Sequence, residues 1–373
     1  MSMRGLVVCA AAIGLFGAAC AAETGTGGEP AVSPGGALPG GGELPDSNGT
    51  IPGPATGGEM DPMTPIGVAG QGGGGLEPPI DDMVDQGMAG AAAPPPVVGA
   101  CTGKPGAMRG KTDQNVLVAG VMRHFVMYAP ASLDPNTPAP VVIAPHGFTM
   151  SGQAMYEITG YDKIADREGF VVLYPDGQGA LPWNVGTGVC GVGAIVGAAG
   201  DDQGFVNGML DFVAADQCLD EAHVFMSGFS MGGYFSNETG CQNSRIRAVG
   251  PHSGGSHDLA ACPNASMPVI VFHGDADALI APMCGSEARD RWAARNGCMA
   301  ASAGVDMRMV QGGQCEYSKG CPDGAQVALC SFAGMGHGWA GGTVGTSPGS
   351  NYAFPNYESA SELGWAFFKE FAW

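Results

Sequence analysis

The sequence predicts an α/β fold in which a mostly parallel central sheet is covered by helices on both faces. Short runs rich in Val, Ile, Leu and Phe do not alternate with polar residues, which is typical of strands buried on both faces. Stretches with apolar residues at helical spacing lie between these runs, and strands that alternate with helices form parallel sheets. The expected strands are 121–129, 140–145, 169–174, 222–227, 268–272 and 326–332, and the expected helices are 202–216, 284–297 and 358–371.

The expected helices have recognisable ends and faces. In the first, apolar residues recur three or four positions apart, and Asp202 can cap the N-terminus. The last carries Leu363, Phe367 and Phe371 on one face. In sheets of this kind, reactive residues gather at the carboxyl ends of the strands. The site is therefore expected in the segments that follow the apolar runs.

The N-terminal hundred residues differ in composition from the rest. Residues 1–20 have a basic residue, an apolar stretch and small residues before Cys20, which predicts a signal peptide, with Cys20 as a candidate lipidation site of the lipoprotein type. Ordinary cleavage near Ala22 is the alternative. Residues 21–100 contain ten acidic residues and no Lys or Arg among Gly, Pro and Ala, which predicts a disordered linker. Residues 101–373 are long enough for one sizeable domain with a hydrophobic core.

Charge and cysteine usage limit the function classes. The formal net charge is -20, and no Lys or Arg cluster could follow a phosphate backbone, so we expect no nucleic-acid binding. Contact with a membrane is expected only through the N-terminal lipid. Ten cysteines lie between Cys101 and Cys330, an even number that predicts disulfides in an exported chain. The closest two, Cys315 and Cys321, do not have the spacing of a zinc site.

Two pentapeptides match the GxSxG pattern, in which a serine occupies a sharp turn between a strand and a helix. With 65 glycines in the chain, about one match is expected by chance. Ser230, in 228–232, follows the apolar run VFMS and precedes a possible helix, so its hydroxyl would lie above the sheet. Ser347, in 345–349, follows no apolar run and is expected in a loop.

A nucleophilic serine needs a base, and the base needs a carboxylate that fixes its tautomer. In α/β proteins with such an elbow, the order along the chain is serine, acid, histidine. His337, in a glycine-rich loop after the last expected strand, is the only one of seven histidines that fits this order. Asp275 and Asp277 both follow the strand 268–272, and their position alone does not choose between them.

Two backbone N–H groups are expected to bind the oxyanion of a tetrahedral intermediate. Met231 directly follows the candidate nucleophile and supplies one of them. Phe148, in the loop after the strand 140–145, is the favoured second donor. His146 in the same loop is expected to be a structural residue rather than a base.

Seven segments occur in a fixed order: HGF (146–148), WNVGTGVCG (183–191), DDQGFV (201–206), CLDEAHVFMSGFSMGG (218–233), HGDAD (273–277), WAARNGC (292–298) and GMGHGWAGG (334–342). Together they resemble the polyhydroxybutyrate depolymerase and feruloyl esterase group of α/β hydrolases, which includes the carbohydrate esterases of family one. The resemblance covers roughly residues 115–370. It is far more specific than the pentapeptide alone.

The resemblance implies the α/β-hydrolase fold and a secreted serine carboxylic ester hydrolase that needs no metal or organic cofactor. The family's HGxxD pattern makes Asp277 the acid, and its histidine loop makes His337 the base. The resemblance also implies a disulfide between Cys298 and Cys321. The chain departs from the family at Gly338, where a Thr or a similar residue is usual, and in the loop after HG, which reads FTMSG.

The segment around WN and Cys190 is more similar to the feruloyl esterase branch than to the polyester branch. The expected substrate is therefore an ester on a plant cell-wall polysaccharide, with Trp183 and Trp339 as candidate contacts or, alternatively, as packing residues. Two other functions stay open: a polyhydroxybutyrate depolymerase, and a non-catalytic envelope protein that binds polysaccharide. The protein is expected to be a monomer located outside the cell or on the outer envelope.

Overall fold

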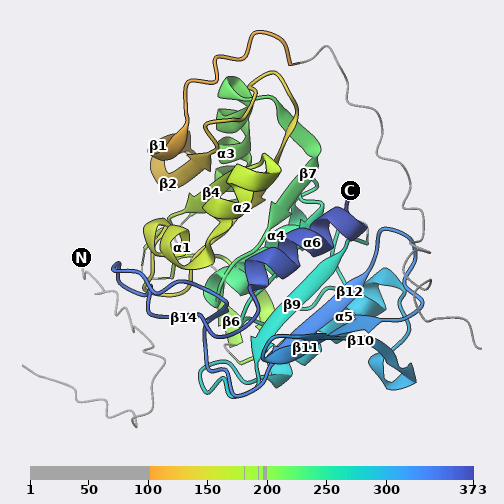
Figure 1. Ribbon diagram of the computed structural model, residues 1–373. Helices are drawn as coiled ribbons and strands as arrows, with labels where there is room; N and C mark the ends of the chain where they lie inside the picture. The colour runs from red at the N-terminus through yellow and green to blue at the C-terminus, as the bar shows by residue number, and fades with distance from the viewer. Residues whose placement is uncertain (1–100, 180, 192, 196–199, 265) are drawn as a thin grey trace, which may run out of the picture. The chain divides into compact units, whose positions relative to one another are not determined.

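The computed structural model is shown in Figure 1. The expected signal peptide (1–20), the lipidation site Cys20 and the expected linker (21–100) lie outside the described residues. The structure describes residues 101–373 except 180, 192, 196–199 and 265.

A ten-stranded mixed sheet forms the centre of the molecule, in the order β1-β2-β4-β3-β7-β8-β9-β12-β11-β10. Its middle six strands are parallel to one another. Except for residues 219–222, which are exposed or half-buried, their residues are mostly apolar and buried, because helices cover both faces of the sheet. These strands are β3 (Ala139–Ile143), β4 (Val171–Pro175), β7 (Leu219–Met226), β8 (Ala248–Val249), β9 (Val269–Gly274) and β12 (Val327–Phe332).

Antiparallel pairs close both edges of the sheet. At one edge β1 (Gly110–Val118) pairs with β2 (Val121–Ala129), which pairs with β4. At the other edge β10 (Val305–Val310) pairs with β11 (Gly313–Ser318), which pairs with β12. The sequence did not predict β1, β10 or β11. Most of their residues are exposed or half-buried, so they lack the continuous apolar runs that identified the central strands.

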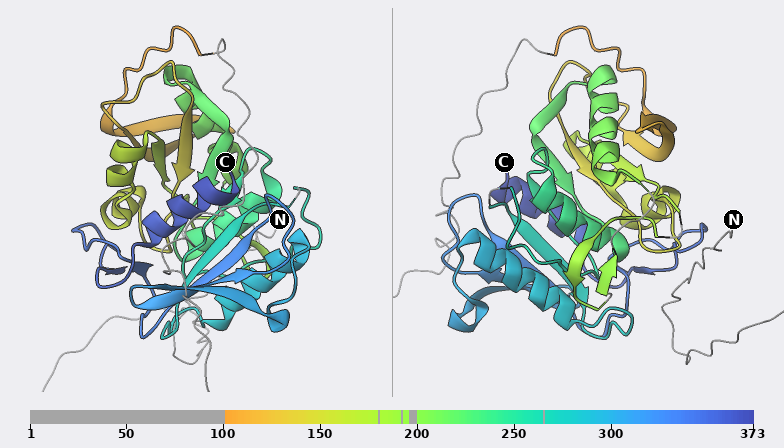
Figure 2. Two further views of the ribbon diagram at one scale, coloured as in Figure 1. Left: turned by 45° about the vertical axis from the view of Figure 1, so that its right-hand side comes forward. Right: turned by 180° about the vertical axis from the view of Figure 1, so that it is seen from behind.

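Helices pack on the two faces, and each face has its own hydrophobic cluster. Along β3, Val141 and Ile143 belong to one cluster and Val142 to the other, as the alternating pleat requires. Figures 1 and 2 show helices on both sides of the sheet. The first face carries α3 (Asp202–Asp216), α4 (Met231–Gln242) and α5 (Met283–Asn296), and the second carries α1 (Gly152–Thr159), α2 (Tyr161–Glu168) and α6 (Ala360–Phe371).

The remaining elements are short: the hairpin β5 (Gly186–Val189) and β6 (Gly193–Ile195), the pair β13 (Trp339–Ala340) and β14 (Ala353–Phe354), and the 3-10 turn η1 (Ala301–Ala303). None of the described helices combines the length and apolarity needed to span a bilayer. All six predicted strands and three predicted helices are confirmed, and their ends differ by no more than three residues from the prediction.

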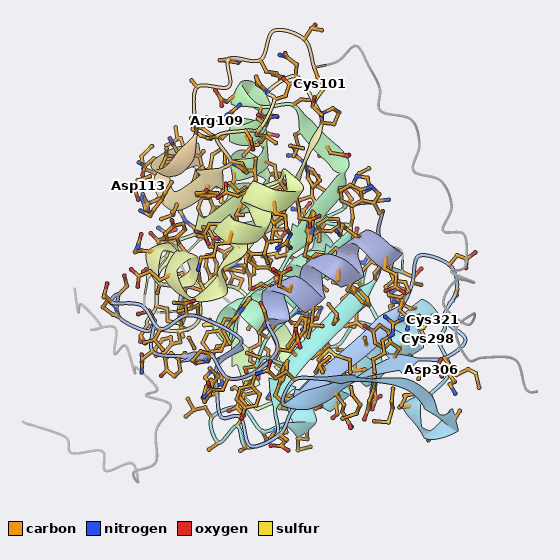
Figure 3. The ribbon with its side chains drawn as sticks, in the orientation of Figure 1. Cys101, Arg109, Asp113, Cys298, Asp306 and Cys321 are labelled. Carbon is orange, nitrogen blue, oxygen red and sulfur yellow. A yellow bond between two sulfur atoms is a disulfide. The ribbon has the colours of Figure 1, made fainter. Side chains whose placement is uncertain are left out.

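The ten cysteines of the domain form five disulfides, as the even number predicted. The pair implied by the family resemblance, Cys298–Cys321, is confirmed and is labelled in Figure 3. The other pairs are Cys101–Cys218, Cys190–Cys284, Cys241–Cys262 and Cys315–Cys330.

Candidate active site

Ser230 occupies a sharp turn between the end of β7 and the start of α4. Its φ of +54° and ψ of −117° are disfavoured for a residue with a side chain. The turn is held by its surroundings, since Ser230 N–H donates to the carbonyl of His252 at 2.8 Å and Phe229 N–H to that of Pro145 at 3.0 Å. A Cβ atom at Gly232 would collide with the Pro145 carbonyl oxygen. This is the nucleophile elbow of the α/β-hydrolase fold, which confirms the predicted fold class.

Three side chains from distant parts of the chain meet at this turn. His337 Nε2 lies 2.9 Å from Ser230 Oγ, and His337 Nδ1 lies 2.7 Å from Asp277 Oδ2. Ser230 follows β7, Asp277 follows β9 and His337 follows β12, so all three stand at the carboxyl ends of parallel strands of the same sheet. With Nδ1–H donated to the carboxylate, Nε2 can accept the serine proton. The exposed Asp275 is turned away and accepts the amide of Gly334 at 2.6 Å.

Asp277 is buried, and its environment favours the charged form. Burial alone would raise its pKa, but hydrogen bonds from His273, His337 and the Ile280 amide outweigh burial and hold the pKa well below the usual range. Oδ1 accepts the amides of Leu279 and Ile280 at 2.9 Å each. Oδ2 lies 3.4 Å from Nε2 of the buried His273. The carboxylate is therefore ionised at neutral pH, and it can stabilise a protonated His337.

The histidine loop is packed against β14, which explains the departure from the family at Gly338. A side chain at this position would collide with the ring of Phe354. The loop backbone is fixed on the other side by Ser253, whose buried hydroxyl donates to the Gly338 carbonyl at 3.2 Å. Sequence reasoning did not identify Ser253, because a serine among glycines gives no signal of this contact.

Both expected oxyanion donors belong to segments beside the nucleophile. Met231 is the first residue of α4, and the first amides of a helix have no partner within it. The loop with Phe148 also reaches the elbow, since a Cβ at Gly147 would lie 3.0 Å from Ser230 Cβ. His146 supports this loop: its buried ring accepts the Gly177 amide at 2.9 Å, and burial lowers its pKa.

Neither candidate tryptophan is accessible to a substrate, which corrects the expectation of a contact and favours the packing alternative. Both side chains are 0% exposed. Trp183 stacks on Phe235 and donates to the carbonyl of His146 at 2.8 Å. Trp339 stacks on His252 with ring centroids 3.5 Å apart. The indole rings extend inward from glycine-rich loops, whose sequence does not reveal the direction of a side chain.

The structure instead places other apolar side chains around the nucleophile. Phe148 is 47% exposed. Met150 Sδ lies 3.1 Å from the position of a Cβ at Gly147, beside Ser230. Tyr352 packs edge-on against His337 with ring centroids 5.8 Å apart. Sequence reasoning did not identify Met150 or Tyr352, since both lie in irregular loops.

Tyr352 ends a segment, residues 343–352, that crosses over α1 and that we call the strap. Glu157 of α1 holds the strap: its carboxylate accepts the amides of Thr346 and Ser347 at 2.7 and 2.9 Å and the Ser347 hydroxyl at 2.7 Å. Burial alone would raise the pKa of Glu157, but these hydrogen bonds and one from Gln153 lower it to about 2. The second GxSxG serine therefore lies in a loop, as predicted, with its hydroxyl bonded to Glu157.

Within the part of the chain that the structure describes, no three His, Cys, Asp or Glu side chains are grouped to hold a metal ion.

No family model matches the chain. Feruloyl esterase B of Piromyces equi is 26% identical over 276 residues, 67% of this chain and 45% of that protein. Feruloyl esterase D of Neurospora crassa is 28% identical over 298 residues, 74% of this chain and 93% of that protein. The chain is therefore similar in sequence to feruloyl esterases over most of the described domain.

The chain also resembles a bifunctional acetylxylan esterase/xylanase of Neocallimastix patriciarum, with 32% identity over 157 residues, 41% of the chain. It spans 21% of that protein and 45% of the Piromyces protein, less than half of either. Among solved structures, an acetyl xylan esterase from Aspergillus awamori gives a TM-score of 0.49 at 17% identity, over 61% of this chain and 94% of that one.

Proposed function

We propose that this protein is a serine carboxylic ester hydrolase that acts on esters of plant cell-wall polysaccharides, as a feruloyl esterase does. The hydrogen-bonded series Ser230, His337, Asp277 at the elbow is the observation that carries the proposal. Similarity to feruloyl esterases and to an acetylxylan esterase/xylanase supports the substrate class. The polyester alternative has no comparable support.

The proposed reaction follows from the order of the three side chains. His337 Nε2 takes the proton of Ser230 Oγ as this oxygen attacks the ester carbonyl carbon. The amides of Met231 and Phe148 bind the oxyanion, and Asp277 stabilises the protonated imidazole. His337 then gives its proton to the leaving alcohol oxygen. Water, deprotonated by His337, attacks the acyl-enzyme, releases the acid and restores Ser230.

The surroundings of the nucleophile are consistent with an aromatic acyl group. We propose that Phe148, Met150 and Tyr352 form the wall against which this group packs. The five disulfides support a location in an oxidising compartment, and the expected signal peptide at 1–20 agrees with export. Export and the lipid on Cys20 are separate proposals from the chemistry.

Labelling with a fluorophosphonate tests the nucleophile. Wild type should be labelled and Ser230→Ala should not, and hydrolysis by Ser230→Ala should fall by at least about 10³-fold. The matched control is Ser347→Ala, which changes the serine of the other GxSxG pentapeptide and should keep both labelling and activity. Equal labelling of Ser230→Ala and wild type would overturn the proposal.

A substrate panel tests the acyl group and the polymer. We expect the highest kcat/KM for methyl ferulate, lower values for acetylated xylan, and no release of acid from short-chain polyhydroxybutyrate. Preference for acetylated xylan would keep the esterase proposal and replace the feruloyl group with acetyl. Preference for the polyester would reject the cell-wall assignment.

A further inference from the structure

A cavity of about 420 Å³ lies at the opposite end of the sheet from Ser230. It opens where β8 and β9 begin and where α6 ends, near the C-terminus marked in Figure 1. Ser230 and Asp277 follow the other ends of the parallel strands. The length of the six-residue β9 alone separates the two sites by on the order of 20 Å. The residues that matter here are Ser244, Arg247, Asn264, Ser266 and Trp373.

Arg247 is an exposed residue that brings a positive charge to the rim of this cavity. Among the nine arginines between residues 101 and 373, it is the one whose guanidinium has no carboxylate or carbonyl partner in the described part of the chain. Seven of the others lie within 4 Å of an acidic side chain, and Arg295 donates to backbone carbonyls. In a chain of net charge -20, a free guanidinium in a cavity is a site for an anion, above all for a planar carboxylate.

One wall of the cavity is rigidly built. Asn264 donates its amide N–H to the Cys241 carbonyl at 3.2 Å and its Nδ2–H to the Gly240 carbonyl at 2.8 Å. Arg295 donates to the carbonyls of Cys262 and Asn264 at 2.8 and 2.6 Å. The disulfide Cys241–Cys262 joins the same segment to α4. The side-chain oxygen of Asn264 is left as an acceptor in a wall that loses little freedom on binding.

An aromatic ring lines the other side. Trp373 is 44% exposed, and its ring is held by stacking on His223, with centroids 4.1 Å apart, and by edge contact with Trp365 at 5.9 Å. A fixed, half-exposed indole gives an apolar surface on which the C–H face of a sugar ring can pack. The neighbouring hydroxyls of Ser244 and Ser266 are exposed and can donate or accept hydrogen bonds.

We propose that this cavity binds a carboxylate-bearing sugar, a hexuronic acid residue. Arg247 binds the carboxylate, the polar side chains of Ser244, Asn264 and Ser266 bind ring hydroxyls, and Trp373 packs against the ring. A cavity of about 420 Å³ has the size of a site for one or two sugar units. Such a site would hold an acidic polysaccharide to the protein far from the nucleophile and raise its local concentration there.

Isothermal titration of the full-length protein tests this site. The probes are glucuronic acid, xylotetraose that carries one glucuronic acid, and neutral xylotetraose. We expect both acidic probes to bind and the neutral one to bind at least tenfold more weakly. Arg247→Gln should lower the affinity for the acidic probes by about ten- to hundredfold, because it removes a charge-assisted pair. Hydrolysis of methyl ferulate should be unchanged, since Arg247 is remote from Ser230.

Arg308→Gln is the matched control. It removes the same charge from an exposed arginine paired with Glu370 and should leave the affinities unchanged. Tighter binding of the substituted tetraose than of glucuronic acid would identify a polymer as the ligand, and equal affinity a single sugar acid. Absence of binding, equal binding of neutral xylotetraose, or equal weakening by both variants would overturn the proposal. Because the titration measures binding and not hydrolysis, Ser230→Ala should bind the probes like wild type, which separates this test from that of the esterase.

Discussion

Asp277 accepts hydrogen bonds on both carboxylate oxygens, which fixes the oxygen that faces His337. Oδ1 is held by amides of the following turn, including that of Ile280 at 2.9 Å, and Oδ2 lies 2.7 Å from His337 Nδ1. In the described contacts, the side chain of Asp275, two residues earlier, accepts only the backbone amide of Gly334 in the histidine loop. The two aspartates therefore make a matched pair for substitution.

Asp277→Asn should lower kcat by about 10²- to 10⁴-fold, with a smaller change in KM, because an amide cannot stabilise the imidazolium or fix its tautomer. Asp275→Asn should keep kcat within about threefold, since it leaves the imidazole in place. Steady-state kinetics with methyl ferulate, beside an unfolding curve for each variant, measures both. A larger loss for Asp275→Asn than for Asp277→Asn would show that the acid is wrongly assigned.

At the residue scale, sequence reasoning could select a site residue where the order of residues along the chain restricted the choice. Ser230 and His337 could be chosen from their place relative to the strands. Asp275 and Asp277 could not be separated in this way, because the choice depends on how the turn after β9 folds, and only the family pattern favoured Asp277. The packing of Trp339 in the core and of Tyr352 beside His337 depends on contacts between remote loops, which local sequence does not encode.

Among the elements, the strap and α1 are joined mainly by the carboxylate of Glu157. The pKa of Glu157 is lowered to about 2, so its stabilising effect is fully present above the ordinary value of about 4.3 and is lost as the pH falls toward 2. Glu157→Gln should lower the free energy of unfolding by about 1 kcal/mol at pH 7, after a discount for solvent screening. The difference from wild type should shrink between pH 5 and pH 3, as measured by urea unfolding at each pH.

The strap also carries Tyr352 against His337, so Glu157→Gln should raise KM for methyl ferulate more than it lowers kcat. Glu362→Gln is the control, because this glutamate pairs with Arg167 on the surface, away from the strap. A stability difference that stays constant from pH 7 to pH 3 would contradict the assigned role of the charge.

The elbow and the loop before Phe148 touch through their backbones at Gly232. Gly232→Ala should destabilise the protein by about 2 kcal/mol and abolish most activity, because its Cβ would push the Pro145 carbonyl and the oxyanion loop away. Gly208→Ala in α3 is the control, because the added Cβ would lie 3.6 Å from Val116, an ordinary contact. This substitution should stabilise the helix by about 0.5–1 kcal/mol. Thermal unfolding and activity separate the two outcomes. Full activity in Gly232→Ala would show that the loop before Phe148 can move without loss of catalysis.

For the whole molecule, the central strands could be predicted because strands buried on both faces must be apolar along their length. The edge strands could not, since β1 and β10 expose much of their surface and read as polar loops. The same sheet order explains the site. It sets β7, β9 and β12 close together, so the segments after them meet at one end although they are far apart in sequence.

The disulfides divide into those near the site and those far from it. Cys190 lies after the β5 strand, and its carbonyl accepts the Tyr234 hydroxyl of α4 at 2.6 Å. Its partner Cys284 lies in α5, shortly after the loop with Asp277. Cys101–Cys218 instead joins the start of the domain to the beginning of β7, at the end of the sheet remote from Ser230.

These two disulfides close loops of similar size, with sequence separations of 94 and 117 residues. Removing either, as a double Cys→Ser variant, should therefore cost a similar free energy of unfolding, about 2–5 kcal/mol. Activity should differ, because the Cys190–Cys284 bond fixes the segments that flank Asp277 and α4. We expect kcat/KM to fall at least tenfold without Cys190–Cys284 and less than twofold without Cys101–Cys218, at a temperature where both variants are folded. Equal losses of activity would mean that the disulfides act only through global stability.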